Sequence, residues 1–563
     1  MAGESIGEAL AQVADFELPL QSVYRWESER PDALYMVQPL DGGRVDEYTW
    51  RRTLDEARRL AAYLKGKGYA PGTTVALVTK NCAQHFIFEI AAWMAGCVTV
   101  SVYPTVDSET LGYILEHAEC PLVFVGKLDA WPGMADGIPG SVEILTCELS
   151  PEVAGATRWQ DVIRESEPMA ESPIRGADET CMLIYTSGTT GKPKGAEHTF
   201  ATSSVTARAL HRLFRYSDDD RMLSYLPLAH VMERAIVFLP SLMFGFQVYF
   251  ADSLETFVDD LKRARPTIFA SVPRLWLKFK TGIEAEMPPE RLKMLLRVPI
   301  VRGTVRRKVL QGLGLDAARI AGTGSAPLPK EIHEWYRDLG LEFLDSLGMS
   351  ELMGLASLSR PGQSKPGTVG TALPGSRIRI SDIGEIEVNS PGVMKGYYKQ
   401  PELTAQAFTE DGWLKTGDQG NIDDEGLLRI TGRVKEIFKT GKGKYVAPAP
   451  IEGLLNATEL IEQCCVMGVG EPAPYVVVML NEQAREAFVN GAREETLRAL
   501  RPVLESVNAR LPKHERLSKL VVTADTWEIA DGLLTPTMKI KRAALEQRYD
   551  ARVKGLGSGV VAL

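Results

Sequence analysis

The sequence has 563 residues, of which 45% are hydrophobic and 24% charged, a composition typical of a folded globular protein. This length exceeds what one hydrophobic core usually supports, so two or more domains are expected. The net charge of −9, with both signs interspersed, argues against nucleic-acid binding.

The cysteines and the apolar stretches indicate a cytoplasmic protein. The seven cysteines are scattered without a C-x-x-C pair, which predicts neither a disulfide framework nor a zinc site and fits a reducing compartment. The N-terminus lacks the basic and apolar regions of a signal peptide. Two apolar stretches, Phe86–Tyr103 and Ala235–Phe250, contain Glu89 and Pro240 respectively, so buried core elements are expected rather than membrane spans. Peripheral contact with the inner face of a membrane stays open.

The first part of the chain alternates predicted helices and strands. A capping box at Thr53–Glu56 predicts the start of a helix that ends at Gly66. The next predicted elements are a strand at Val75–Val78, a helix from Phe86, a strand at Val98–Tyr103, a helix near Ser108–Glu119 and a strand at Pro121–Val125. This alternation predicts parallel βαβ units and an α/β fold.

The segment Tyr185–Gly195 combines three glycines, four aliphatic hydroxyls and two lysines directly after an apolar run. Glycine lets backbone N–H groups approach an anion closely, while hydroxyls and lysines add donors and positive charge. These residue types predict a phosphate-binding loop rather than a flexible linker. Only two residues separate Gly188 from Gly191, and Pro193 stands where a Walker loop needs a hydroxyl, so a Walker loop is excluded.

From Arg377 the pattern changes to short alternating strands. Arg377–Ile380 and Glu385–Val388 predict an antiparallel hairpin, and Asp423–Gly426 predicts a turn before a strand at Leu427–Thr431. About 130 residues follow Gly432, enough for a small independent domain. We therefore expect domains at 1–432 and 433–563.

The phosphate-binding loop resembles the signature loop of the adenylate-forming superfamily, which includes acyl-CoA synthetases, peptide-synthetase adenylation domains and luciferases. Six further motifs follow in the order of that superfamily and span nearly the whole chain. They are Leu226–Arg234, Gly322–Pro327, Gly348–Glu351, Trp413–Asp418, Gly432–Glu436 with Lys439–Pro448, and Leu534–Arg542. The His-x-x-Glu-Arg ending of the first and the form of the last resemble the long-chain fatty-acyl-CoA synthetases.

This resemblance implies a large N-terminal adenylation domain with βαβ sheets and a small β-barrel-like subdomain. A small mobile α+β C-terminal domain would follow, with the hinge at Lys435. The implied reaction joins a long-chain fatty acid to AMP from ATP, releasing pyrophosphate, and then transfers the acyl group to coenzyme A. Because an anionic carboxylate must attack an anionic phosphate, Mg²⁺ and cationic side chains are required.

The resemblance also implies roles for individual residues. The catalytic residues would be Lys539, Glu351, His230 and Lys194, with Lys539 bridging carboxylate and phosphate in the adenylation transition state. The nucleotide-binding residues would be Thr186, Ser187, Gly188, Thr189, Thr190, Gly191, Lys194, Gly324, Ser325, Ala326, Leu347, Gly348, Ser350, Asp418 and Arg433. Thr189 and Glu351 would hold Mg²⁺. Gly443, with Gly441 as the competing choice, would border the coenzyme A channel, although both glycines also suit a simple hairpin turn.

Two positions depart from the superfamily pattern. Leu347 replaces an aromatic residue, so ring stacking on adenine is lost there. Arg234 occupies the position where some long-chain members carry a tryptophan gate, so no such gate is assigned. Alternative functions are a synthetase for medium-chain or aromatic acids, a fatty-acyl-AMP ligase, and a non-catalytic nucleotide-binding regulator. The sequence does not predict which acyl-chain length is preferred, and it does not decide between a monomer and a homodimer.

Overall fold

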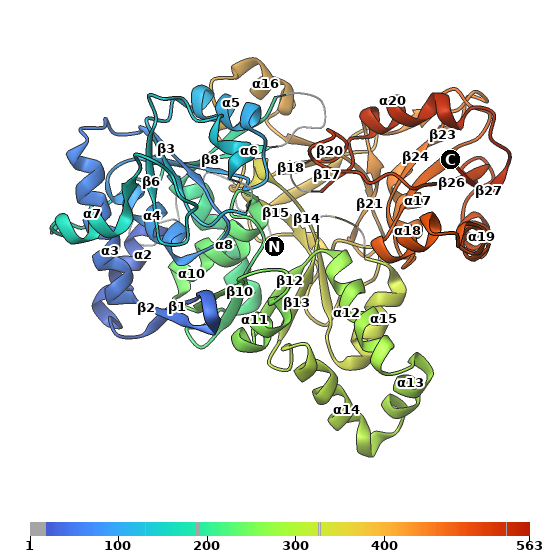
Figure 1. Ribbon diagram of the computed structural model, residues 1–563, viewed down its shortest axis with the longest axis horizontal. Coiled ribbons are helices and arrows are strands. Elements are labelled where there is room, and N and C mark those ends of the chain that lie inside the picture. The colour runs from blue at the N-terminus through green and yellow to red at the C-terminus, as the bar shows by residue number, and fades with distance from the viewer. Residues whose placement is uncertain (1–17, 130, 187–191, 325, 327, 536–537) are drawn as a thin grey trace.

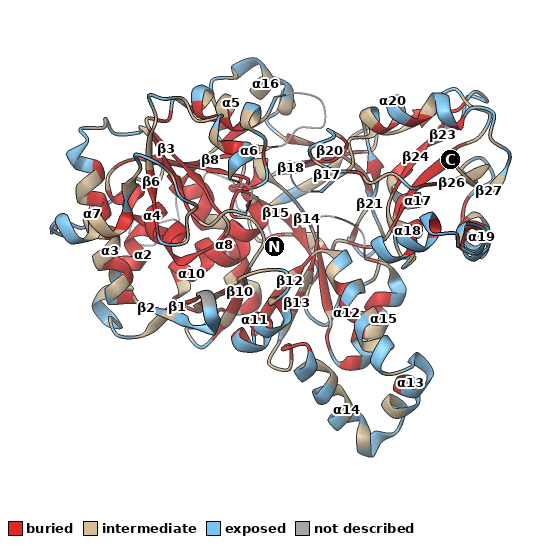
Figure 2. Cartoon of the chain, viewed as in Figure 1, coloured by how far each residue is buried: buried red, intermediate tan, exposed pale blue. Residues whose placement is uncertain are grey.

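The computed structural model describes residues 18–129, 131–186, 192–324, 326, 328–535 and 538–563. A large lobe runs from α2 (Pro19–Glu29) to β21 (Leu428–Arg433), and a smaller lobe begins at β22 (Phe438–Lys439). Figure 1 shows the smaller lobe in orange and red beside one end of the large lobe. Buried residues are concentrated in the sheets and in the helix faces against them (Figure 2).

The central sheet of the large lobe has eight strands in the order β19-β9-β8-β4-β3-β5-β6-β7. They are β3 (Thr74–Val78), β4 (Val98–Val102), β5 (Leu122–Val125), β6 (Glu143–Thr146), β7 (Thr157–Arg158), β8 (Thr180–Thr186), β9 (Lys194–Thr199) and β19 (Gly396–Tyr397). The strands from β3 to β8 pair in parallel, whereas β9 and β19 are antiparallel. Helix α3 (Trp50–Gly66) leads into β3, crossover helices α4 (Ala83–Met94) and α5 (Ser108–Ala118) join β3 to β4 and β4 to β5, and β3 and β4 are buried throughout. The predicted α/β class is confirmed.

Two further sheets complete this α/β region. One has the order β10 (Arg221–Ser224), β11 (Gln247–Phe250), β1 (Leu34–Pro39) and β2 (Val45–Thr49). The other has the order β12 (Ile268–Ser271), β13 (Ile320–Thr323), β14 (Phe343–Met349), β15 (Gly354–Leu358) and β16 (Thr371–Ala372). The other helical elements of the large lobe are η2 (Asp41–Gly43), α6 (Pro132–Ala135), α7 (Trp159–Glu165), α8 (Phe200–Phe214), α9 (Val231–Glu233), η3 (Arg234–Phe238), α10 (Leu239–Phe244), α11 (Phe257–Ala264), α12 (Pro273–Glu286), α13 (Pro289–Arg297), α14 (Pro299–Gly312), α15 (Lys330–Leu339), η4 (Ser350–Leu352) and α16 (Pro401–Ala407).

An antiparallel sheet ends the large lobe, in the order β17 (Arg377–Ile380), β18 (Glu385–Asn389), β20 (Leu414–Ile422) and β21. Strands β17 and β18 form the predicted hairpin, with Ile378 opposite Val388. At the predicted turn before β21, the Gly426 amide donates to the Asp423 carbonyl at 2.8 Å. This sheet is the small β-rich subdomain that the resemblance implied.

The smaller lobe has a core of its own. Its sheet has the order β24 (Ile461–Met467), β25 (Tyr475–Leu480), β26 (Lys519–Thr523) and β27 (Gly559–Ala562). Its other elements are β23 (Tyr445–Val446), α17 (Pro448–Leu455), α18 (Glu482–Val489), α19 (Arg493–Arg510) and α20 (Arg542–Val553). Alternate residues of β25 join two different apolar clusters: Val476 and Val478 enter one, and Val477 and Met479 the other. The sheet is thus covered on both faces.

Helix α3 begins one turn earlier than predicted. Its N-cap is Thr49, whose side chain accepts from the Arg52 amide at 3.2 Å. Thr53 lies inside the helix, and its hydroxyl donates to the Thr49 carbonyl at 2.8 Å. The predicted capping box was wrong because a threonine within a helix, followed by glutamate three residues later, has the same sequence pattern.

Both apolar stretches considered as membrane spans are buried core elements. Every residue of α4 is buried, and so is every residue of η3. No helix in the described parts of the chain is both long and apolar enough to cross a membrane. All seven cysteines are buried and unpaired.

A buried ion pair explains why Glu89 interrupts the first apolar stretch. The Arg234 guanidinium donates to both Glu89 carboxylate oxygens, at 2.6 and 3.0 Å, and its Nε donates to the Leu228 carbonyl at 2.6 Å. His85 Nε2 lies 3.1 Å from the same carboxylate. Burial opposes ionisation of Glu89, but the charge of Arg234 and these hydrogen bonds hold its pKa at about 2. The pair joins α4 to the start of η3.

We expect Arg234→Met to lower the free energy of unfolding by about 3–5 kcal/mol, because it leaves a buried carboxylate without its partner. Glu89→Gln combined with Arg234→Met should recover part of this loss. Because the folded-state pKa of Glu89 lies below its ordinary 4.5, the stabilisation is fully present above that pH and lost as the pH falls toward 2. Urea unfolding at several pH values measures this; a double variant no more stable than the single one would contradict it.

Candidate active site

Strands β8 and β9 hold the two ends of the predicted phosphate-binding loop. Thr186, the last residue of β8, pairs with Lys194, the first residue of β9. The structure thus places these two predicted residues opposite each other. The tip of the loop, with predicted residues Ser187, Gly188, Thr189, Thr190 and Gly191, lies outside the described residues.

Tyr397 brings Lys194 and Glu351 together. The Tyr397 hydroxyl donates to Glu351 Oε1 at 2.7 Å, and Lys194 Nζ lies 5.1 Å from the centre of the Tyr397 ring. Burial, with the adjacent Glu351 carboxylate, raises the pKa of Tyr397, so this phenol remains a donor at neutral pH. Tyr397 belongs to β19, outside every motif that the sequence analysis identified.

Glu351 fits a Mg²⁺ ion that is shared with phosphate. No other hydrogen bond to its carboxylate occurs among the described residues, so Oε2 is open to a ligand. No group of three or more acidic, histidine or cysteine side chains able to hold a metal occurs there either. A single carboxylate suits Mg²⁺, which takes one or two protein carboxylates and completes its shell with substrate phosphates and water.

His198 positions the backbone next to Glu351. Its Nε2 donates to the Ser350 carbonyl at 2.7 Å, across 152 positions of sequence. Burial lowers the pKa of His198 to about 4, so the ring is neutral at physiological pH and acts as a fixed donor. A histidine inside strand β9 carries no local sequence signal for this role.

The strand that ends at Ser350 requires glycine at position 348. A Cβ atom there would lie 2.2 Å from the Gly354 carbonyl oxygen on the neighbouring strand. Gly348 itself is exposed, whereas the Leu347 side chain is turned into an apolar cluster with Leu352 and Ile386. The open surface beside the motif is therefore backbone.

Asp418 and Arg433 form a pair across strands β20 and β21. They are opposite in register, and Arg433 Nε donates to Asp418 Oδ1 at 3.0 Å. Burial raises the pKa of the Asp418 carboxyl, and the positive charges of Arg433 and Lys539 only partly oppose this shift. A carboxylate acceptor held in place by a cation suits the hydroxyl groups of a ribose.

The smaller lobe places Lys539 against this pair. The Lys539 side chain remains accessible to solvent, but protein atoms surround it on several sides. This crowding, together with the Arg433 charge, lowers the pKa of Lys539, while Asp418 and Glu436 oppose the shift. The lysine is therefore a solvent-accessible cation at the junction of the two lobes, in surroundings that disfavour its charge.

His230 lies on the other side of the junction. It caps α9, with its Nδ1 accepting from the Met232 amide at 3.2 Å, so the neutral ring carries its proton on Nε2. Burial, and then the charge of Lys539, lower its pKa to about 4. His230 and Lys539 are thus brought together, with only the lysine charged at neutral pH.

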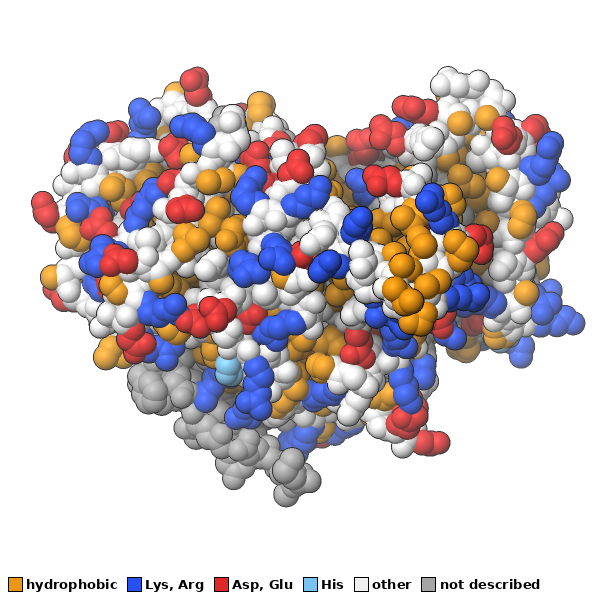
Figure 3. Space-filling view, turned by 90° about the horizontal axis from the view of Figure 1, so that it is seen from below, with side chains coloured by type: hydrophobic (Ala, Val, Ile, Leu, Met, Phe, Trp, Pro, Cys, Tyr) orange, Lys and Arg blue, Asp and Glu red, His pale blue; other side chains and the backbone are white. Residues whose placement is uncertain are grey.

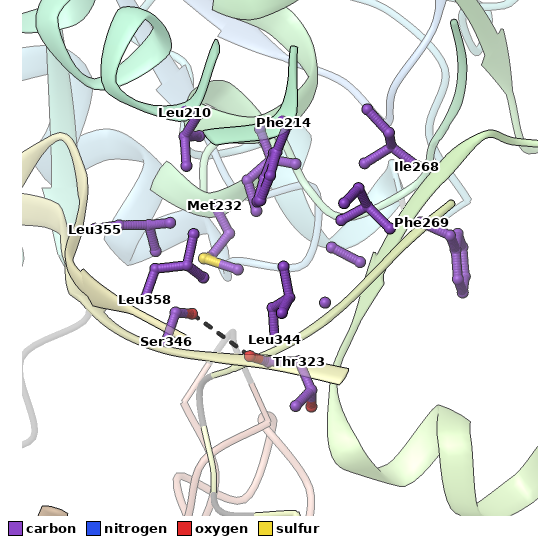
Figure 4. A pocket seen from close by; sticks show the side chains of 14 residues that line it. Leu210, Phe214, Met232, Ile268, Phe269, Thr323, Leu344, Ser346, Leu355 and Leu358 are labelled. Carbon is purple, nitrogen blue, oxygen red and sulfur yellow. Dashed lines mark hydrogen bonds between the residues drawn. The ribbon is translucent and has the colours of Figure 1, made fainter. Parts of the chain in front are cut away.

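An apolar cavity, whose lining Figure 4 shows, lies next to the segments that carry His230 and Gly324. The cavity is narrow, with a volume of about 20 Å³. Its lining is Leu210, Phe214, Met232, Ile236, Ile268, Phe269, Ala270, Ile320, Gly322, Thr323, Leu344, Ser346, Leu355 and Leu358. Met232 follows His230 by two residues, and Thr323 precedes Gly324.

Gly324 stands at the boundary between the cavity and the polar junction. A Cβ atom there would meet Ser346 Oγ at 3.0 Å and the Met232 methyl carbon at 3.6 Å. Gly324 is buried and Ala326 is exposed, while Ser325 lies outside the described residues.

The predicted hinge and coenzyme A residues lie in the segment that enters the smaller lobe. Lys435 is exposed in the turn after β21. Gly441 and Gly443 lie in the hairpin between β22 and β23, where the Gly443 amide donates to the Thr440 carbonyl at 2.8 Å. A Cβ atom on Gly441 would lie 2.4 Å from the Gly470 carbonyl oxygen. The hairpin turn is thus present, with Gly441 packed against its own lobe.

The sequence profile of the AMP-binding enzyme family matches residues 23–398. The chain belongs to this family. The profile of the AMP-binding enzyme C-terminal domain matches residues 436–558, which covers most of the smaller lobe. The family assignment agrees with the motifs and with the geometry around Lys539.

Curated relatives match nearly the full length. A long-chain-fatty-acid–CoA ligase, FadD15, of Mycobacterium bovis is 30% identical over 94% of this chain and 96% of its own. Long-chain-fatty-acid–CoA ligase 1 of Homo sapiens is 29% identical over 90% of this chain and 81% of its own.

Solved structures share the fold at lower identity. The adenylation domain of a carboxylate reductase from Mycobacterium chelonae has a TM-score of 0.80 at 21% identity, over 98% of this chain and 92% of that domain. An anthranilate CoA ligase, solved in complex with anthranoyl-AMP, has a TM-score of 0.78 at 20% identity, over 97% of this chain and 99% of its own.

We expect Gly348→Ala to reduce adenylation at least about tenfold, because its methyl group must displace the Gly354 backbone and with it Ser350 and Glu351. Acid-dependent ATP–pyrophosphate exchange measures the effect. Gly282→Ala in helix α12, where an added Cβ meets nothing within 4 Å, is the matched control and should retain full activity. Equal activity of both variants would show that the close approach at Gly348 is unimportant.

We expect Glu436→Gln to shift the alkaline limit of adenylation to lower pH. Glu436 raises the pKa of Lys539, so its removal makes the lysine lose its proton, and its charge, at a lower pH. The pH profile of pyrophosphate exchange measures the shift. Glu410→Gln, which removes an exposed carboxylate elsewhere in the large lobe, should leave the profile unchanged; an equal shift in both variants, or a shift to higher pH, would contradict the assignment.

Proposed function

We propose that this protein is an AMP-forming long-chain fatty-acyl-CoA synthetase. One observation carries the proposal: an apolar cavity ends beside the junction where Lys539, Asp418, Arg433 and His230 converge. An acyl chain in the cavity would bring its carboxylate to Gly324 and His230, facing Lys539. The long-chain-fatty-acid–CoA ligases among the relatives support this substrate class.

In the first half-reaction, the acid carboxylate attacks the α-phosphorus of ATP and pyrophosphate leaves. Lys539 donates hydrogen bonds to both reacting groups and compensates their negative charge. The neutral His230 ring offers its Nε2 proton to a carboxylate oxygen without adding a second charge beside Lys539.

The remaining polar residues hold the nucleotide. Asp418 accepts from the ribose hydroxyls, with Arg433 fixing its orientation. Thr186, Lys194 and the loop between them bind the β- and γ-phosphates, and Gly324, Ala326, Gly348 and Ser350 border the base and the α-phosphate. Mg²⁺, when bound by Glu351 and Thr189, neutralises phosphate charge as the oxygens become more negative.

The second half-reaction requires the smaller lobe to move. Coenzyme A attacks the acyl-AMP carbonyl through its thiol, and AMP leaves. Lys539 now occupies the junction, whereas Gly441 packs against Gly470 of the smaller lobe and Gly443 lies in the adjoining hairpin turn. Rotation at Lys435, the hinge between domains 1–432 and 433–563, would exchange Lys539 for the glycine hairpin, with Gly443 beside the thiol channel.

The apolar walls of the cavity favour a hydrocarbon chain, which would enter by moving them apart, over the alternatives. Its walls are almost wholly aliphatic or aromatic, which suits hydrocarbon and offers few partners for a polar ring substituent. A non-catalytic regulator would not need Lys539, Asp418 and Glu351 in functional positions. Unpaired buried thiols fit a cytoplasmic location.

We expect Lys539→Ala to lower acyl-adenylate formation by at least about a hundredfold, because the reacting anions lose their shared cation. Thioester formation from supplied acyl-AMP should persist, since the second half-reaction uses the other orientation of the lobe. Lys541→Ala, on the same segment, is the control for both assays. Equal loss of both half-reactions would contradict the two-orientation mechanism.

The acid specificity is tested by thioester yield across a panel from short to long chains, with aromatic acids included. Yield should rise with chain length, because each buried methylene adds roughly 0.8 kcal/mol of transfer free energy. A preference for an aromatic acid would favour the alternative synthetase, and acyl-AMP without thioester would favour the ligase that stops at the adenylate.

A further inference from the structure

Helices α13 and α14 form a hairpin that projects from the large lobe at the bottom of Figure 1. None of the 14 residues of α14 is buried, and Leu292 is the only buried residue of α13. Helices of a globular protein normally bury an apolar stripe. Here Leu296, Val309 and Leu310 anchor the hairpin to the lobe, and its outer end has no protein partner in the described chain.

The outer end of the hairpin is apolar. Ile300 is 92% exposed, Met294 60% and Val298 41%, and Ile300 is the most exposed large hydrophobic side chain of the described residues. Figure 3, which views the molecule from below, shows apolar side chains grouped where α13 and α14 face the viewer, with basic side chains around them. An exposed apolar patch of this kind marks a surface that binds a membrane or another molecule.

Uncompensated positive charge surrounds the apolar end. The hairpin, residues 289–312, contains seven Lys or Arg residues and a single acidic residue, Glu290, a net charge of +6 in a chain of net charge −9. Six of the seven cations are exposed: Arg291, Lys293, Arg297, Arg302, Arg307 and Lys308. None of the seven forms an ion pair with a described carboxylate, although many other arginines of the chain do. Arg306, the seventh, donates to the Asp338 carbonyl at 2.6 Å.

We propose that the α13–α14 hairpin docks the protein on the surface of an anionic lipid bilayer. Exposed Met294, Val298 and Ile300 enter the boundary between headgroups and acyl chains, and the surrounding cations pair with lipid phosphates. This combination of apolar end and unpaired cations matches an interfacial lipid-binding helix, since burial and electrostatic attraction act together there. A protein partner would need acidic groups over the whole hairpin, whereas an anionic bilayer supplies them continuously.

The hairpin is also connected to the acyl cavity. It lies in the crossover between β12 and β13, and both strands contribute cavity walls through Ile268 and Ile320. Docking would therefore hold the cavity close to the phase in which a long-chain acid dissolves. This consequence rests on the proposed function; the docking itself does not.

The test is sedimentation of the full-length protein with vesicles of equimolar phosphatidylcholine and phosphatidylglycerol. The charge variant is Arg302→Gln/Arg307→Gln/Lys308→Gln, and the apolar variant is Met294→Gln/Ile300→Gln. The matched control, Arg498→Gln/Arg501→Gln/Lys513→Gln, removes three exposed cations of the smaller lobe. All substituted side chains are exposed, so folding should be retained, which thermal unfolding verifies.

We expect the charge variant to lose about 100-fold in the vesicle partition coefficient, since each cation near an anionic surface contributes about fivefold. The apolar variant should also bind less, and the control should bind like the unchanged protein. Binding of the unchanged protein should weaken as salt is raised and be weak on pure phosphatidylcholine vesicles.

Three outcomes would overturn the proposal. They are equal binding by both hairpin variants and the control, equally strong binding to neutral vesicles, and a lipid-free dimer that the hairpin substitutions dissociate, as measured by sedimentation velocity. Loss of vesicle binding with normal thioester formation from a water-soluble short-chain acid separates docking from catalysis. Failure of the proposed enzyme activity would leave the binding result unaffected.

Discussion

The buried ion pair between Glu89 and Arg234 fixes the part of the chain on which the candidate site depends. Arg234 ends the His-x-x-Glu-Arg sequence, and its guanidinium also binds the Leu228 carbonyl, so both ends of the segment that carries His230 are tied to one side chain. Glu89 in turn belongs to α4, which covers the central sheet. Charged groups without water hold one geometry because any displacement leaves a charge unpaired. The segment Leu228–Arg234, which lies between the apolar cavity and the junction of the two lobes, is thereby attached to the core of the large lobe.

Around that fixed segment, the protein concentrates charge where two anions must meet. Lys539 comes from the smaller lobe, Asp418 and Arg433 from the last sheet of the large lobe, and Glu351 from η4, directly after β14. The neighbouring histidines, His198 and His230, are neutral because burial lowers their pKa to about 4. They add hydrogen bonds without competing with the cations. Tyr397 similarly contributes a proton donor to Glu351 and not a charge.

Sequence patterns predicted much of the fold but not all of its details. Strands β3 and β5, and the hairpin of β17 with β18, followed from local alternation and were found within a residue or two. The start of α3 was missed because Thr53 followed by Glu56 imitates a capping box inside a helix. Motif order was sufficient to propose Lys539, Asp418 and Glu351. His198 and Tyr397 could not be found that way, since each acts through a contact more than 40 residues distant.

The sequence by itself determined the family, the α/β alternation and the set of chemical groups, because those depend on residue type, spacing and order. Only the tertiary structure decided that Lys539 and His230 share one junction and that an apolar cavity opens beside it. It also decided that the hairpin of α13 and α14 has an unpaired, basic and apolar surface. Proximity, burial and exposure arise from contacts between residues hundreds of positions apart, and these determine pKa values and binding surfaces that no local pattern contains.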